Sequence, residues 1–120
     1  MAEKFTWHRI ATSYELDHEL VLPEQSVKVI EVEDKLVCLG RYKGNYYALK
    51  NKCMHAGGYL GEGQCDFEGN VICPFHRYRY SLITGKNTSG EGYYALTYPL
   101  ETRQDGLYIG FPAKSWWNIF

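Results

Sequence analysis

The sequence lacks the features that mark several large classes of protein. Its longest apolar runs, such as Leu36-Val37-Cys38-Leu39, reach only about four residues, whereas a membrane-spanning helix needs roughly 20. The 13 basic and 14 acidic side chains leave a net charge of −1, so there is no basic stripe for nucleic acid. Residues 1–9 contain no apolar h-region and no small-residue cleavage site. We therefore expect a cytoplasmic protein that binds neither nucleic acid nor a membrane.

A helical pattern is also missing. No stretch shows apolar residues with a period of 3.6 over three turns, and the chain has no internal repeat. Its 120 residues are 45% hydrophobic, which is enough for one domain with its own core. The aromatic fraction of 16%, mostly tyrosine, favours strands. We therefore expect a single all-β domain over residues 1–120.

Short strand-like runs alternate with turn residues along this domain. The expected strands are residues 5–10, 27–32, 36–42, 46–50, 71–73, 79–83, 95–101 and 107–111. Between them lie turn signals such as Gly44-Asn45, Thr84-Gly85 and Asp105-Gly106. The chain becomes rich in glycine after Asn51, and glycines let a backbone approach a bound group closely.

The glycine-rich part contains two mixed pairs of cysteine and histidine. Cys53 and His55 form a C-x-H pair; after 17 intervening residues, Cys73 and His76 form a C-x-x-H pair. A two-iron cluster with split ligation requires one thiolate and one imidazole from each of two loops, so that one iron takes both cysteines and the other both histidines. Tetrahedral zinc also accepts two cysteines and two histidines, but zinc modules usually pair C-x-x-C with H-x-H-type spacing. The spacing therefore favours the iron–sulfur cluster over a structural zinc module.

Through these motifs the chain resembles the soluble Rieske-type ferredoxins, and the resemblance extends over its whole length. It implies the Rieske fold, with three antiparallel sheets and a cluster-binding subdomain of two loops at about residues 52–82. It places one 2Fe-2S cluster on Cys53, His55, Cys73 and His76, which match the family's four ligand positions.

Of four positions near these ligands, three separate the chain from the respiratory Rieske proteins. Those proteins carry a disulfide between two extra cysteines, at the places that Gly58 and Phe75 occupy here. Their cluster also receives hydrogen bonds from a serine and a tyrosine; here Tyr78 stands in the serine place and Tyr80 keeps the tyrosine. Fewer donors stabilise the negative charge of a reduced cluster less and so lower its potential. The pattern points to the ferredoxin branch.

The resemblance implies a monomeric electron carrier without catalytic residues of its own. It would pass single electrons from a flavin-dependent reductase to an oxygenase-type acceptor, at a potential near the lower end of the range of about −150 to +300 mV. The alternative is a small Rieske subunit of a larger reductase, such as a nitrite reductase. A catalytic oxygenase subunit is excluded, because its mononuclear iron needs two further histidines and none follows His76.

Two other cysteines and the end of the chain have simpler interpretations. Cys38 lies in an apolar strand and Cys65 in a turn-rich stretch, and both are expected to be structural thiols. A disulfide framework conflicts with the missing secretion signal. The aromatic segment around Trp116 and Trp117 is expected to pack onto its own domain, since exposed tryptophan pairs reduce solubility.

Overall fold

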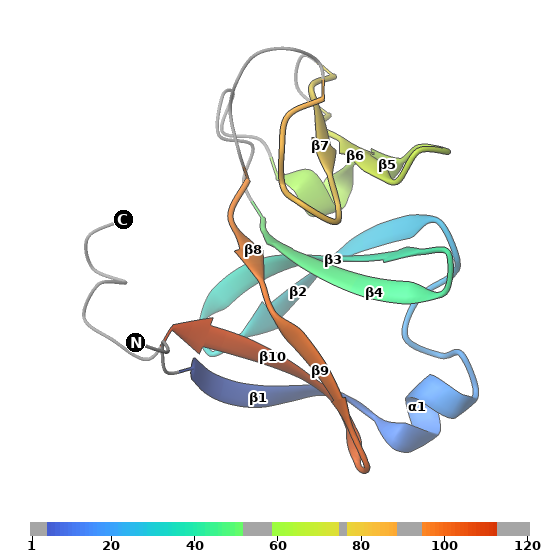
Figure 1. The fold of residues 1–120 in the computed structure, drawn as a ribbon, viewed down its shortest axis with the longest axis vertical. Coiled ribbons are helices and arrows are strands. Elements are labelled where there is room, and N and C mark those ends of the chain that lie inside the picture. The colour runs from blue at the N-terminus through green and yellow to red at the C-terminus, as the bar shows by residue number, and fades with distance from the viewer. Residues whose placement is uncertain (1–4, 52–58, 75–76, 89–94, 113–120) are drawn as a thin grey trace.

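Three antiparallel sheets make up the computed structural model, which describes residues 5–51, 59–74, 77–88 and 95–112. The sheets have the strand orders β1-β10-β9, β2-β3-β4-β8 and β5-β6-β7. Figure 1 shows them in succession along the long axis of the molecule, with β5-β6-β7 at one end and β1-β10-β9 at the other. The strands are β1 (Phe5–Thr12), β2 (Ser26–Val32), β3 (Lys35–Tyr42), β4 (Asn45–Lys50), β5 (Gln64–Cys65), β6 (Asn70–Ile72), β7 (Arg79–Ser81), β8 (Thr97–Tyr98), β9 (Leu100–Arg103) and β10 (Gly106–Pro112).

The middle sheet is a meander built on two tight hairpins. β2 and β3 pair without interruption from Ser26–Arg41 to Val32–Lys35. Both residues of the intervening turn, Glu33 and Asp34, have positive φ, as do Lys43 and Gly44 between β3 and β4. Positive φ at both central residues is the property of type I′ turns, whose twist matches that of the flanking strands.

The end sheet β5-β6-β7 packs on the middle sheet through one apolar core, here called the upper core. Cys38 and Leu49 project into it from paired positions on β3 and β4. The end sheet contributes Val71 and Tyr80, which also face each other across β6 and β7. The other buried members of the upper core are Leu60, Cys73, Leu82 and Ala95. The end sheet is therefore fixed to the rest of the fold by packing.

The expected all-β class with three antiparallel sheets is confirmed, and several local details differ. A five-residue helix, α1 (Ser13–Asp17), follows β1, with a capping box between Thr12 and Glu15 at its start. The expected strand over residues 95–101 is divided at Pro99 into β8 and β9, because proline has no N–H to donate to a ladder. β7 ends at Ser81, whose hydroxyl oxygen accepts the backbone N–H groups of Ile83 and Thr84.

The described part of the chain includes no helix of the length and apolarity that a membrane crossing requires. The single-domain boundary and the subdomain limits of about 52–82 stay predictions.

Candidate functional site

The second predicted ligand loop connects β6 to β7, and its first ligand is held at the base. Cys73 directly follows β6 and is fully buried in the upper core. Its backbone N–H donates a hydrogen bond to the carbonyl oxygen of Tyr78 at 2.7 Å. Arg77, one residue earlier, has φ of 59°, in the left-handed region that reverses the chain direction. The loop is thus closed by its own backbone between Cys73 and Tyr78.

The first predicted ligand loop begins after β4 and returns to the described structure at η1 (Leu60–Glu62), a single 3₁₀ turn. At the beginning of the loop, Asn51 is buried, and its side-chain Oδ1 accepts the backbone N–H of Gly61 at 2.6 Å. At the end, Leu60 is fully buried in the upper core, which also contains Cys73. Both loops therefore start and finish at the same core.

A glycine brings the two loops into backbone contact. A Cβ atom on Gly63, just after η1, would overlap the carbonyl oxygen of Ile72, the residue before Cys73. Any side chain at this position would push the loops apart. The contact borders a hollow of about 220 Å³ whose walls come from both loops, with Glu62, Gly63 and Gln64 on one side and Ile72, Cys73, Pro74 and Arg77 on the other.

Of the four predicted ligands, the structure describes Cys73 alone. Cys53, His55 and His76 lie outside the described residues, as do Gly58 and Phe75. Within the described ranges, no three histidine, cysteine, aspartate or glutamate side chains gather around a common point. The assignment of the four ligands stays a prediction. What the structure adds is the placement of the two segments that carry them.

Two of the positions predicted to lie near the ligands are described. Tyr80 on β7 is fully buried, with its side chain in the upper core beside Cys73. Tyr78 is half-buried and packs against the same core from the loop. Tyr80 therefore lies on the strand that directly follows the second ligand loop, and Tyr78 lies at the end of that loop. A hydrogen bond from Tyr80 to the cluster stays a prediction.

Cys38 and Cys65 are free thiols, and their surroundings separate them from the predicted ligands. Burial raises the pKa of Cys38 to about 12, and the nearby Cys65 contributes in the same direction. Burial also raises the pKa of Cys65 to about 11, followed by the charges of Asp66 and Glu24. Thiols with raised pKa values are poor nucleophiles and poor ligands. Both cysteines fit the structural role expected for them.

Asp66, which the sequence analysis did not single out, holds the turn between β5 and β6. Its Oδ1 accepts the backbone N–H groups of Glu68 and Asn70, each at 2.9 Å, and its Oδ2 accepts Asn70 Nδ2 at 3.2 Å. Burial acts to raise the pKa of Asp66, but these hydrogen bonds and the charge of Arg79 outweigh it, so the pKa is lowered. The aspartate keeps the end sheet in shape next to the ligand loops.

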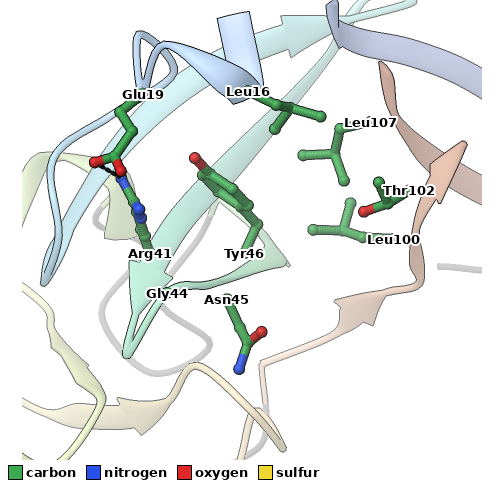
Figure 2. Close-up of a pocket in the computed structure, with 9 residues that line it drawn as sticks. All are labelled: Leu16, Glu19, Arg41, Gly44, Asn45, Tyr46, Leu100, Thr102 and Leu107. Carbon is green, nitrogen blue, oxygen red and sulfur yellow. Dashed lines mark hydrogen bonds and ion pairs between the residues drawn. The ribbon is translucent and has the colours of Figure 1, made fainter. Parts of the chain in front are cut away.

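A second hollow lies between α1, the β3–β4 turn and β9-β10 (Figure 2). It has a volume of about 340 Å³ and an apolar side formed by Leu16, Leu100 and Leu107. Its cation, Arg41, already pairs with Glu19 at 3.5 Å and Glu24 at 3.7 Å. We therefore assign Arg41 the structural role of joining β3 to the segment between α1 and β2.

The donor set suits an iron–sulfur centre. Two thiolates and two imidazoles, divided between two loops that share one core, match the split ligation of a two-iron cluster. Cys73 is buried without an aqueous surface, and the glycine contact at Gly63 keeps the loop bases together. The residues present therefore fit a 2Fe-2S cluster.

Comparison with known proteins points the same way. The family described as "Rieske [2Fe-2S] domain" matches residues 6–97. A human Rieske domain-containing protein is 40% identical over 58 residues, which make up 46% of this chain and 37% of that protein. The chain thus spans little more than a third of the length of that relative. The 3-phenylpropionate/cinnamic acid dioxygenase ferredoxin subunit of Photorhabdus laumondii is 28% identical over 89 residues, covering 73% of this chain and 84% of the relative.

Solved structures show the same fold. The ferredoxin of carbazole 1,9a-dioxygenase from Nocardioides aromaticivorans superposes with a TM-score of 0.73 and 27% identity, over 89% of this chain and 98% of that one. A structure from Mycobacterium tuberculosis described as an NADH-dependent nitrite reductase small subunit superposes with a TM-score of 0.75. It is 19% identical, over 93% of this chain and all of the other, and supports the fold alone.

Proposed function

This chain belongs to the Rieske [2Fe-2S] domain family, and we propose that it is an electron carrier that passes single electrons from a flavin-dependent reductase to an oxygenase-type acceptor. The observation that carries the proposal is the joining of two ligand-bearing loops at one core, through Leu60, Cys73 and the Gly63–Ile72 contact. Two similar proteins of comparable length, from Photorhabdus laumondii and Nocardioides aromaticivorans, are ferredoxins of dioxygenase systems.

The proposed ligands are Cys53 and Cys73 on one iron and His55 and His76 on the other. When bound, the cluster supplies one-electron oxidation and reduction at a centre that is neutral in its diferric form. The chain's own residues hold the loops: the Cys73–Tyr78 hydrogen bond closes one loop, and Asn51 joins the ends of the other. Zinc, which the spacing alone left open, is disfavoured by the family match.

We place the carrier in the cytoplasm as a monomer that meets its two partners in turn. Cys38 and Cys65 form no disulfide, which is typical of a reducing compartment. A one-electron carrier needs its cluster end accessible to both partners, and β5-β6-β7 forms one end of the molecule (Figure 1). A permanent partner on that end would block the exchange.

The experiment that tests this function is a redox titration followed by transfer. We expect the anaerobic protein to take up one electron per chain from dithionite, reversibly, and then to reduce one equivalent of ferricytochrome c. Absence of a reversible one-electron couple in protein that has been reconstituted with iron and sulfide would contradict the proposal.

A second candidate is the small Rieske subunit of a larger reductase, which the shared fold with the nitrite reductase small subunit favours. The two functions differ in assembly. A carrier elutes from size-exclusion chromatography of its native cell extract at the size of one chain. A subunit elutes with a large flavin- or haem-containing partner in fixed ratio.

A further inference from the structure

Asn51 connects the middle sheet to the first ligand loop. It directly follows β4, and its backbone N–H donates to the carbonyl oxygen of Leu36 on β3 at 3.3 Å. Its side chain is 3% exposed. Cys53, the first proposed ligand, lies two residues further along the chain.

The Asn51 carboxamide closes the base of this loop. Its Oδ1 accepts the N–H of Gly61 at 2.6 Å, so that a side chain at one end of the loop is fixed to the backbone at the other. Gly61 is held closely: a Cβ there would lie 2.9 Å from Asn51 Oδ1 and 2.5 Å from Val29 Cγ2. The preceding residue, Leu60, is buried in the upper core and anchors the C-terminal end of the loop. Asn51 and Leu60, which flank the segment that carries Cys53 and His55, are therefore both held in place.

The NH₂ group of the Asn51 carboxamide makes no hydrogen bond within the described residues. Its nitrogen, Nδ2, is buried. The Gly61 N–H needs an acceptor, so the carboxamide cannot rotate by half a turn to bring Nδ2 to that position. Buried donors in folded proteins almost always have a partner in the protein, in ordered water or in a bound group. A neutral donor thus remains at the base of the ligand loop.

We propose that Asn51 is a positioning residue for the cluster: Oδ1 keeps the first ligand loop closed, and Nδ2 donates a hydrogen bond to the thiolate side of the loaded loop. The inference rests on the proposed function, since it requires Cys53 and His55 to be ligands. A donor to a ligating sulfur stabilises the extra negative charge of the reduced centre and raises its potential. Asn51 therefore has two separable effects, on retention of the cluster and on its potential.

Three variants separate these effects from general destabilisation. Asn51→Ala removes both the acceptor and the donor. Asn51→Asp keeps an acceptor for Gly61 and removes the NH₂ group. Asn70→Ala is the matched control, because Asn70 is equally a buried asparagine of this region, but its side chain bonds to Asp66.

Cluster loss is measured as the decay of visible absorption in excess EDTA, and the potential by dye-mediated titration with EPR detection. We expect Asn51→Ala to lose the cluster about tenfold faster than the unmodified protein, as is typical for partners of metal ligands. Asn70→Ala should lose it within about twofold of the unmodified rate, even where its unfolding midpoint is lower. Asn51→Asp should retain the cluster better than Asn51→Ala but show a lowered potential.

The results that overturn the inference differ from those that overturn the function. Unmodified protein that binds no 2Fe-2S cluster contradicts the proposed function. Unmodified protein with a normal cluster, alongside Asn51→Ala with an unchanged loss rate, contradicts the closure role. Asn51→Asp also adds a negative charge, which by itself lowers the potential, so the donor role is tested on the neutral Asn51→Ala, in which an unchanged potential contradicts it. If Asn51→Ala does not fold, Asn51→Leu replaces it in both measurements, because leucine is close to asparagine in size and has neither the acceptor nor the donor.

Discussion

The backbone N–H of Cys73 lies 2.7 Å from the carbonyl oxygen of Tyr78 and donates a hydrogen bond to it. This bond spans the segment that contains His76 and fixes its ends through the main chain. Because the two bonded groups belong to the backbone, the loop tolerates changes in its exposed side chains. It depends instead on the backbone conformation of the residues between them.

Substitution of Arg77 tests whether the loop depends on this backbone conformation, because its φ of 59° is costly for most residues. A β-branched residue is disfavoured in this region more strongly than arginine, and glycine adopts it without a steric cost. We expect Arg77→Val to lower the free energy of unfolding by about 1–2 kcal/mol relative to Arg77→Gly. Urea unfolding of both variants measures the difference. Equal stabilities would show that this conformation is not needed in the folded loop.

Tyr80 is predicted to donate a hydrogen bond toward the cluster from its buried position on β7. Tyr80→Phe should leave the cluster intact and lower its potential by about 20–60 mV, which corresponds to one hydrogen bond of about 0.5–1.5 kcal/mol in a one-electron couple. Tyr98→Phe, a buried tyrosine of β8 in a different core cluster, is the control and should leave the potential unchanged. The potential is read by EPR-monitored titration. No shift in Tyr80→Phe would mean that Tyr80 makes no hydrogen bond to the centre.

Asp66 is expected to stabilise the end sheet in a pH-dependent way. Its lowered pKa means that the folded protein favours the ionised carboxylate, so the stabilisation is complete above about pH 4 and is lost as the pH falls further. Asp66→Ala should cost about 1–3 kcal/mol at pH 7, because it leaves the N–H groups of Glu68 and Asn70 without their acceptor. The urea midpoint of Asp66→Ala should lie further below that of the unmodified protein at pH 7 than at pH 3. A constant difference between these pH values would exclude a role for the ionised carboxylate.

Cys38 is expected to make the stability of the protein fall at alkaline pH. Its pKa rises to about 12 in the folded protein from 9.0, so the unfolded chain loses the thiol proton first. Stability should therefore fall as the pH rises above about 9, by roughly 1 kcal/mol at pH 10. Cys38→Val keeps an apolar side chain and should show a smaller fall between pH 8 and pH 10. Parallel losses in both proteins would assign the alkaline effect to other groups.

The sequence alone was sufficient for the parts of the fold that depend on local pattern. Alternating residues and turn signals predicted the strands of the β2-β3-β4 meander, and the spacing of the two cysteine–histidine pairs predicted the cluster. Short elements were missed for the same reason. α1 has too few residues to show a helical period, although the capping box of Thr12 and Glu15 is readable.

The contacts that join the two ligand loops could not be predicted in this way. Asn51 and Gly61 are ten residues apart, and no local pattern indicates that their polar groups pair. The approach of Gly63 to the carbonyl of Ile72 also depends on how the sheets pack. Similarly, the turn between β3 and β4 is centred on Lys43-Gly44, one residue earlier than the expected Gly44-Asn45. The strand register that places such a turn depends on which face of the sheet is buried in the folded protein.

Iron and acid-labile sulfide analysis of anaerobically purified protein, with an EPR spectrum after dithionite reduction, tests the central claim most directly. We predict two irons and two sulfides per chain and the low-average-g rhombic signal of mixed histidine–cysteine ligation. His76→Ala should lose both the sulfide and the signal. One zinc per chain, with no sulfide and no signal after reconstitution with iron and sulfide, would contradict the electron-carrier function.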